Sequence, residues 1–331
     1  MVGVDAQYPT PIVKNLMPDD EMPCTAMSWA LRAQHDACVP PWKGSLLRGA
    51  LGWALERTAA GAPAPAWPGL RIGTTLTTVL LDPQGAWSSP LATPPAAMQC
   101  TDERTRIPEG DTLQGRLLLF GEWPAWALAL LGEGFADAAL HGLGAQRHPF
   151  RLVEWTAAPE TWPEAPAQPT ALELRTLTPC RLMDRKAECC NLHPPAIARS
   201  LLRRWRQLHR QLQGSDPAGD HQALAQAADQ LQASETGTIT ATIKRWSNRQ
   251  SRHVDMPGLT GSVTITGDSL PLLAPYLARA PLLHIGKQPV FGLGQVELAW
   301  RTAADSATAR NESCAQPKFQ LQDDPMTQDA L

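Results

Sequence analysis

The chain carries little excess charge of either sign. It holds 29 Lys and Arg against 32 Asp and Glu in 331 residues, a formal net charge of −3, and its pI is about 6.2. A protein that binds nucleic acid over most of its surface is usually strongly basic, often with a pI above about 9. The composition therefore excludes a generally basic nucleic-acid binder, and any RNA site must be a local patch.

Paired cysteines and long apolar runs are also missing. The 7 cysteines are odd in number and show no paired spacing, and the N-terminus, MVGVDAQYPTP, has no charged region followed by an apolar one. We therefore expect a protein of the reducing cytoplasm. The most apolar stretch, residues 123–140, is interrupted by glycines and acids, so it is not a membrane span.

Metal-binding patterns are weak. Cys180, Cys189, Cys190 and His193 are close in sequence, but adjacent cysteines rarely both reach one ion, and zinc ligands usually come as Cys-x2–4-Cys pairs. We interpret these cysteines as ordinary thiols and predict no metal site. No cluster of carboxylates suggests a two-metal nuclease.

What the chain does have is a glycine-rich stretch near its C-terminal end. Residues 282–298 read LLHIGKQPVFGLGQVEL, with Gly286, Lys287, Gly292 and Gly294 between two strand-like segments. Glycines this dense let a backbone approach a bulky anion, and a lysine adds positive charge. A P-loop needs Gly-Lys-Ser/Thr before a helix, and a dinucleotide fingerprint also needs a following helix, so neither motif fits. A plain glycine-bearing hairpin is the alternative.

Other blocks of sequence suggest a family. Residues 44–55 read GSLLRGALGWAL, and LQGRLLLFGEW, HGLGAQRHPFRL, LTPCRLMD and RWSNRQSR follow in order before the glycine-rich stretch. Together these blocks resemble the RAMP superfamily of CRISPR proteins, and within it the endoribonuclease that processes precursor crRNA. The resemblance covers roughly residues 25–300. The glycine-rich loop is shared by the whole superfamily, so the order of the blocks is what favours the nuclease.

The predicted elements fit this resemblance. Strands are expected at 26–34, 71–81, 112–121 and 150–155, with helices from Ser45 to about Arg57 and over 124–140. This is the ferredoxin-like order, and the second half of the chain repeats it weakly. We predict an α+β fold of two tandem ferredoxin-like domains with a C-terminal Gly-rich loop. The expected divisions are an N-terminal arm (1–24), an N-terminal domain (25–158), a Pro-rich linker (159–169), a C-terminal domain (170–302) and a disordered tail (303–331).

Two basic clusters are candidate RNA contacts. The first is a stripe at i, i+4, i+7 and i+11 on one predicted helix; the second lies near Trp246. Basic side chains neutralise phosphates, and an aromatic ring can stack on a base. A solvated helix face is the alternative for any one of these charges. The predicted RNA-binding set is Gly286, Lys287, Gly292 and Gly294 with Arg199, Arg203, Arg206, Arg210, Lys244, Arg245, Arg249 and Arg252.

The resemblance also implies where catalytic side chains lie, namely on the first strand, the loop after it and the following helix. His35 is the predicted general acid or base, Arg48 the cation for the reacting phosphate, and Lys43 a reserve cation. His284 is a weaker candidate, and Arg32 or Arg48 would serve by charge alone if no histidine takes part. Structural roles remain open: a strand-end histidine for His35 and an ion pair for Arg48.

The implied activity is metal-independent cleavage of CRISPR precursor RNA inside the repeat, giving a 2′,3′-cyclic phosphate and a 5′-hydroxyl without any cofactor. The expected partners are repeat RNA or crRNA and other Cas subunits of an effector complex. The alternatives are a non-catalytic RAMP subunit that only binds guide RNA and a scaffold that binds none. Cleavage assays separate the first from the enzyme, and a gel shift with repeat RNA tests the second.

Overall fold

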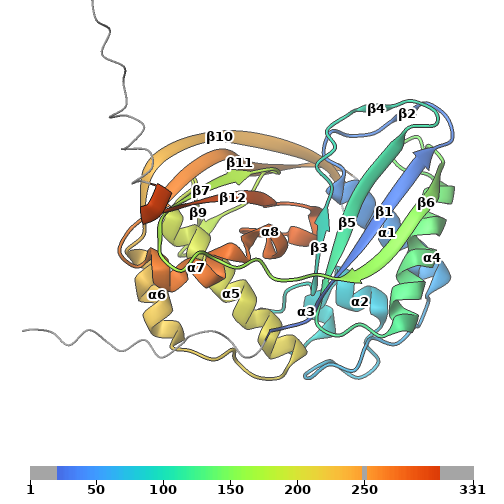
Figure 1. The fold of residues 1–331 in the computed structure, drawn as a ribbon. Coiled ribbons are helices and arrows are strands. Elements are labelled where there is room, and N and C mark those ends of the chain that lie inside the picture. The colour runs from blue at the N-terminus through green and yellow to red at the C-terminus, as the bar shows by residue number, and fades with distance from the viewer. Residues whose placement is uncertain (1–20, 248–251, 306–331) are drawn as a thin grey trace, which may run out of the picture.

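The computed structural model describes residues 21–247 and 252–305 and consists of two four-stranded antiparallel sheets side by side (Figure 1). At the far end of the β10–β11 hairpin, the side chains of residues 243–247, 252–254 and 256 are not described. The arm predicted for 1–24 and the tail predicted for 303–331 lie almost wholly outside the described residues.

The N-terminal sheet has the strand order β3-β5-β1-β6, with every neighbouring pair antiparallel. Two helices connect its strands in the order strand, helix, strand, strand, helix, strand, which is the ferredoxin-like arrangement. Its elements are β1 (Cys24–Ala33), α1 (Gly44–Thr58), β3 (Ala96–Gln99), β5 (Thr112–Phe120), α4 (Ala125–His141) and β6 (Phe150–Pro159), with the additions β2 (Ala37–Cys38), α2 (Leu76–Leu81), α3 (Pro83–Ala86) and β4 (Arg106–Ile107).

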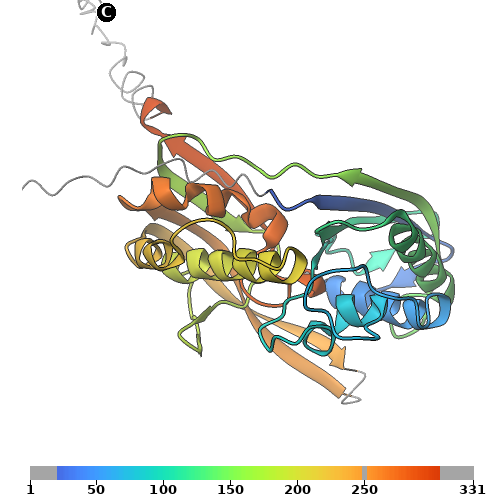
Figure 2. The same cartoon turned by 90° about the horizontal axis from the view of Figure 1, so that it is seen from below.

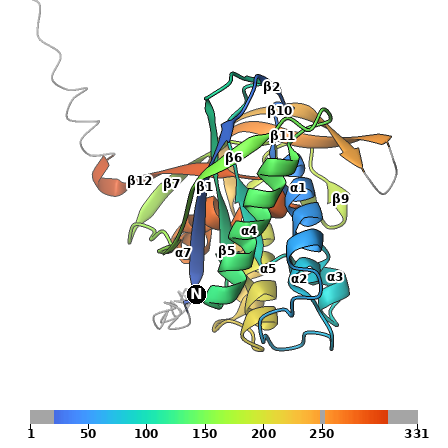
Figure 3. The ribbon, with the colours of Figure 1, turned by 90° about the vertical axis from the view of Figure 1, so that its right-hand side faces the viewer.

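Buried and solvent-exposed side chains alternate at the start of β5, as expected for a sheet with one covered face. Leu113 and Leu117 are buried against the helices. Thr112 and Gln114, on either side of Leu113, point to the opposite face and remain accessible to solvent. Figure 3 shows α1 and α4 lying together across the covered face. Among the described residues, no helix covers the other face of the N-terminal sheet, which is called the open face below.

The C-terminal sheet repeats the same topology in the order β10-β11-β7-β12. Its helices lie together on one side of the sheet, as the view from below shows (Figure 2). The elements are β7 (Pro169–Thr176), β8 (Met183–Asp184), β9 (Ala187–Glu188), α5 (Pro194–Leu212), α6 (His221–Asp229), β10 (Gln232–Ser247), β11 (Arg252–Thr266), α7 (Leu270–Ala278), α8 (Ala280–Leu283), the 3-10 turn η1 (Pro289–Phe291) and β12 (Val296–Thr302). The predicted α+β fold with two tandem ferredoxin-like domains is confirmed.

β10 and β11 are far longer than the sheet they belong to. β11 pairs with β7 only over Ser262–Ile265, so the rest of the hairpin projects past the sheet as a two-stranded arm (Figure 2). Cys180 and Leu259 exchange backbone hydrogen bonds of 2.9 and 2.8 Å, which fix the arm where it leaves the sheet.

The two domains share one continuous hydrophobic core. Arg204, on α5 of the C-terminal domain, is 5% exposed and donates hydrogen bonds to Thr93 Oγ1 (2.7 Å) and to the carbonyl of Ala96 (3.2 Å) in the N-terminal domain. Trp162, in the segment predicted as a linker, is buried against Phe120 and Trp205. These contacts hold the two sheets in a fixed relation. The predicted domain boundaries themselves stay predictions.

One predicted strand is wrong. Residues 71–81 were expected to be β from their threonines and valine, but Leu76–Leu81 forms helix α2. Thr75 caps this helix by accepting a hydrogen bond from the Thr78 amide at 3.2 Å. Leu76, Val79 and Leu80 then form one buried face at helical spacing. Within the described part of the chain, no helix is both long and apolar enough to span a bilayer.

Candidate functional site

Two stretches that are far apart in the chain, residues 44–49 and 286–294, meet between the domains. Gly44, the first residue of α1, lies so close to the Phe291 carbonyl that a Cβ at position 44 would overlap it. Arg48, one turn along α1, stacks its guanidinium 4.3 Å from the centre of the Phe291 ring and donates to the Leu81 carbonyl at 2.6 Å. The GSLLRG and GKQPVFGLG blocks of the sequence therefore form a single structural unit.

The glycines of residues 284–295 are required by backbone geometry. Gly286, Gly292 and Gly294 have φ values of 76°, 75° and 73°, which side chains with a Cβ rarely adopt. Thr178, 5% exposed, closes this segment by donating to the Gly292 carbonyl at 2.7 Å and accepting from the Gln295 amide at 2.9 Å. The segment is thus rigidly tied to the loop after β7, and Lys287 on it is exposed to solvent.

His284 lies inside this unit and is held neutral. It is 1% exposed, and its Nδ1–H donates to the Leu293 carbonyl at 2.9 Å, a contact that fixes the tautomer. Burial lowers its pKa to about 3, and the nearby charge of Arg204 acts in the same direction. A histidine in this state packs the loop and does not exchange protons near neutral pH.

The state of His284 predicts how stability depends on pH. Because its folded pKa of about 3 lies below the ordinary 6.5, the unfolded chain binds a proton more readily between these two values. Its contribution to stability is complete above about pH 6.5 and is lost as the pH falls toward 3, at about 1.4 kcal/mol per pH unit. From pH 6.5 to 5 we expect a loss of roughly 2 kcal/mol, measurable by urea unfolding.

His284→Asn is the comparison variant, because asparagine tolerates a positive φ and its amide can replace the Nδ1–H donor. We expect it to remove most of the pH dependence between 5 and 6.5. An identical pH dependence in variant and wild type would contradict the assignment.

Lys43, predicted as a reserve cation, is a buried side chain that holds two loops together. Its side chain is 0% exposed, and Nζ donates to the backbone carbonyls of Asp102 (2.7 Å) and Arg104 (2.6 Å), with the Asp102 carboxylate 3.6 Å away. Burial lowers its pKa, and the charge of Asp102 opposes that shift. In this arrangement Lys43 anchors the start of α1 to the loop after β3 and does not reach solvent.

His35 lies in the loop directly after β1 and is 74% exposed. Its Nδ1 is 3.8 Å from the Glu109 carboxylate, next to the small β2–β4 ribbon at the top of Figure 1. Arg48 faces α2 and Phe291 instead. The structure therefore brings Arg48 together with the glycine-rich segment and leaves the His35 ring largely exposed to solvent.

The predicted arginine stripe does run along α5, but acids of β8, of the end of α6 and of the loop after α5 pair with most of it. Arg199 donates to Asp184 at 2.6 Å and also pairs with Asp229. Arg206 and Arg210 share Asp216, and their hydrogen bonds hold the pKa of that carboxyl well below its usual range. Arg203 is exposed. Arg249 lies outside the described residues, as do the side chains of Lys244, Arg245 and Arg252.

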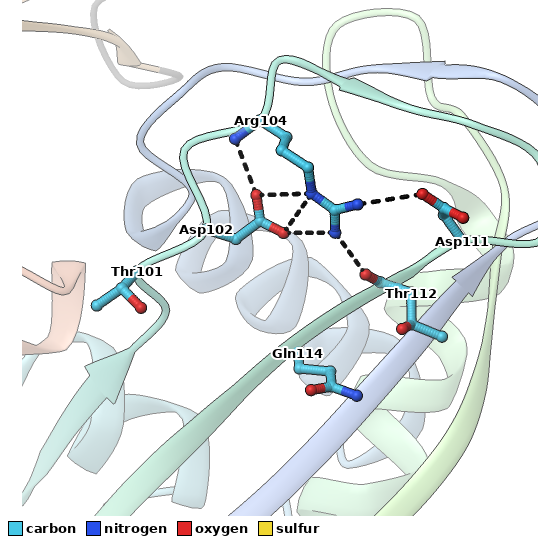
Figure 4. Close-up of a pocket in the computed structure, with 6 residues that line it drawn as sticks. All are labelled: Thr101, Asp102, Arg104, Asp111, Thr112 and Gln114. Atoms are coloured by element: carbon cyan, nitrogen blue, oxygen red, sulfur yellow. Dashed lines mark hydrogen bonds and ion pairs between the residues drawn. The ribbon is translucent and has the colours of Figure 1, made fainter.

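The open face of the N-terminal sheet carries two adjoining polar cavities of about 560 and 410 Å³. Both are lined by Thr101 and Gln114, so they form one groove. The first cavity also takes in Asp102, Arg104, Asp111 and Thr112 (Figure 4). The second reaches the domain boundary and adds Ser28, Trp29, Gln99, Cys100, Gly115, Arg116, Glu154 and Gln295. The groove is thus rich in groups that hydrogen-bond to polar ligands.

Arg104 crosses the upper end of the groove. It donates to the Asp102 carboxylate at 2.7 Å, to the Thr112 carbonyl at 2.7 Å and to Asp111 at 3.1 Å (Figure 4). Burial raises the pKa of Asp102, but the hydrogen bonds from Arg104 outweigh it and keep that pKa below its ordinary value. No sequence pattern pointed to this cluster, because its members come together only through the loop between β3 and β5.

The cysteines behave as ordinary side chains. Cys180 is 0% exposed, and burial raises its pKa to about 12. Cys189 is half-buried and Cys190 exposed. Within residues 21–247 and 252–305, no three His, Cys, Asp or Glu side chains are grouped as potential metal ligands.

The chain is similar to known proteins over most of its length. A family model described as CRISPR-associated endoribonuclease Cas6 matches residues 174–296, and another described as an N-terminal domain matches residues 22–168. No curated protein matches.

Solved structures share the fold. A Thermus thermophilus Cas6 superposes with a TM-score of 0.53 at 17% identity, covering 85% of this chain and 100% of that one. The product complex of the same Cas6 gives 0.53 at 19% identity, covering 84% and 100%. A partial Cas6-RT-Cas1–Cas2 complex gives 0.51 at 10% identity, covering 86% of this chain and 47% of that one.

Proposed function

We propose that this chain is a CRISPR-associated endoribonuclease of the Cas6 type, which cleaves CRISPR precursor RNA within the repeat to give mature crRNA. The observation that carries the proposal is the Cas6 match of residues 174–296 within a chain that has the fold of Thermus thermophilus Cas6 along that protein's entire length. Repeat RNA is the substrate and crRNA the product.

We further propose that the reaction needs no metal ion. The 2′-hydroxyl beside the cleaved bond attacks the phosphorus, and the bond to the 5′-oxygen breaks. A base takes the proton of the hydroxyl, an acid protonates the leaving oxygen, and cations stabilise the charge that gathers on the phosphate. The products are a 2′,3′-cyclic phosphate and a 5′-hydroxyl.

His35 is our candidate for the acid or base. Its 74% exposure leaves the ring accessible to RNA, and the 3.8 Å contact with Glu109 is too long to occupy it. Arg48 and Lys43 are better suited to positioning, because Arg48 stacks on Phe291 and Lys43 is buried under two carbonyl groups. Lys287, Arg203 and the basic residues of the β10–β11 hairpin are the candidates for phosphate contacts.

Labelled repeat RNA incubated with the protein in EDTA tests this chemistry. We expect cleavage at a single position, at the same rate with EDTA as with Mg²⁺, and a 3′ fragment that accepts a phosphate from polynucleotide kinase because its 5′ end is a hydroxyl. Cleavage that stops in EDTA would contradict the metal-independent mechanism. Partners in the cell would be crRNA itself and further Cas subunits that keep it bound.

A further inference from the structure

Arg32 and Arg151 are directly opposite each other on neighbouring strands. They are cross-strand partners in the β1–β6 register, so both side chains point to the same face of the sheet, the open face. Opposite residues of an antiparallel pair have their Cβ atoms only about 5 Å apart. Two positive charges this close repel each other, so the arrangement is unfavourable in the free protein.

Within the part of the chain that the structure describes, no ion pair relieves this repulsion. Both side chains are exposed, and among the residues that the structure describes no carboxylate lies within 4.0 Å of either guanidinium. The corresponding arginine of the other sheet is different: Arg175 on β7 has Glu297 as its cross-strand partner on β12 and forms an ion pair with it. On β5, Arg116 pairs with Glu160. The Arg32–Arg151 pair is therefore arranged to receive an anion from outside the chain.

The surroundings of the pair indicate which anion. On its other side Arg32 is the cross-strand partner of Thr112, which lines the 560 Å³ cavity of the open-face groove. His35 follows Arg32 by three residues, a chain length that spans at most about 10 Å. Guanidinium groups bind phosphates through pairs of parallel N–H···O bonds, and two guanidiniums side by side can grip one phosphate from both sides.

We propose that Arg32 and Arg151 form a phosphate clamp that holds one phosphodiester of the substrate RNA at the upper end of the groove, next to His35. This inference rests on the proposed function for the identity of its ligand. It adds Arg151, which sequence patterns did not single out, and it gives Arg32 a binding role beside the histidine.

Arg151→Glu tests the clamp, with Arg71→Glu as the matched control. Arg71 is an exposed arginine in the turn before α2, and it undergoes the same charge change away from the groove. The ligand is repeat RNA with a 2′-deoxy nucleotide at the cleaved position, so that binding is measured without cleavage. Affinity is determined at several salt concentrations, and the Tm of the free protein is measured in parallel.

The new carboxylate at position 151 would repel phosphate and also pair with Arg32, so both contacts are lost. We expect affinity to fall by about tenfold to a hundredfold near 0.1 M salt. The slope of log affinity against log salt should become shallower by about 1.4, at about 0.7 per contact. Arg71→Glu should match the wild type. The Tm of free Arg151→Glu should stay level or rise, because repulsion is replaced by attraction.

Arg151→Gln gives a second test with a milder change. It should make the slope of log affinity against log salt shallower by about 0.7, the value for the loss of one phosphate contact, without lowering Tm. If wild type binds and cuts repeat RNA while both Arg151 variants keep its affinity and slope, the clamp is wrong and the proposed function stands. If wild type does not bind repeat RNA at all, the proposed function is wrong, and the clamp, which depends on it, is wrong as well.

Discussion

His35→Ala should slow single-turnover cleavage of repeat RNA by about 10²- to 10⁴-fold, because a positioned acid or base typically contributes that much to proton transfer. This corresponds to roughly 3 to 5 kcal/mol of activation barrier. RNA affinity should remain near that of the wild type. The side chain is 74% exposed, and its one polar contact with the described residues is long, so its removal should hardly change folding stability.

His141→Ala is the matched control for this prediction. His141 is 51% exposed at the end of α4, where its Nδ1 is 3.1 Å from Asp137. Its loss should leave the cleavage rate unchanged. If His35→Ala cuts at the wild-type rate while Arg32→Ala or Arg48→Ala does not, catalysis depends on arginine charge alone and His35 is not the acid or base.

Gly44→Ala should destabilise the protein by roughly 1 to 3 kcal/mol, because the added methyl group would overlap the Phe291 carbonyl, and backbone atoms on both sides must shift to admit it. The same shift displaces the segment that carries Lys287, so RNA binding should weaken as well. Urea unfolding gives the change in stability, and a gel shift gives the change in affinity.

Gly49→Ala makes the same substitution five residues further along α1, where a Cβ would meet nothing within 4 Å. Alanine is the better helix former, so this variant should be more stable than the wild type by about 0.5 to 1 kcal/mol. The two substitutions should therefore have opposite signs. Equal stability of both variants, with RNA binding intact in Gly44→Ala, would contradict the close packing of α1 on the glycine-rich segment.

Much of the fold follows from local patterns. The alternation in residues 112–121 and the apolar periodicity of 124–140 predicted β5 and α4 within a residue of their observed ends. β3 was not predicted, since AAMQ has no β-branched residue and becomes a strand only by pairing with β5. The helix at Leu76–Leu81 was mistaken for a strand because its β-branched residues outweighed the capping signal of Thr75.

The site was harder to predict, because its charges are set by contacts between distant residues. The helical spacing of Arg199, Arg203, Arg206 and Arg210 was visible in the sequence, but not that Asp184, Asp216 and Asp229 would pair with three of them. The burial of Lys43 depends on carbonyls about 60 residues away. The opposition of Arg32 and Arg151 likewise requires the strand register, which the sequence alone does not specify.

The central claim, that this chain is an RNA-cleaving enzyme whose nucleophile belongs to the substrate, is tested most directly by one comparison. Wild-type protein is given repeat RNA in EDTA, either unmodified or with a single 2′-deoxy nucleotide at the mapped cleavage position, and binding and cleavage are measured on the same samples. We predict equal binding of both RNAs and cleavage of the unmodified one alone. Tight binding of both RNAs with cleavage of neither would contradict the enzyme assignment and identify the chain as a subunit that only binds guide RNA.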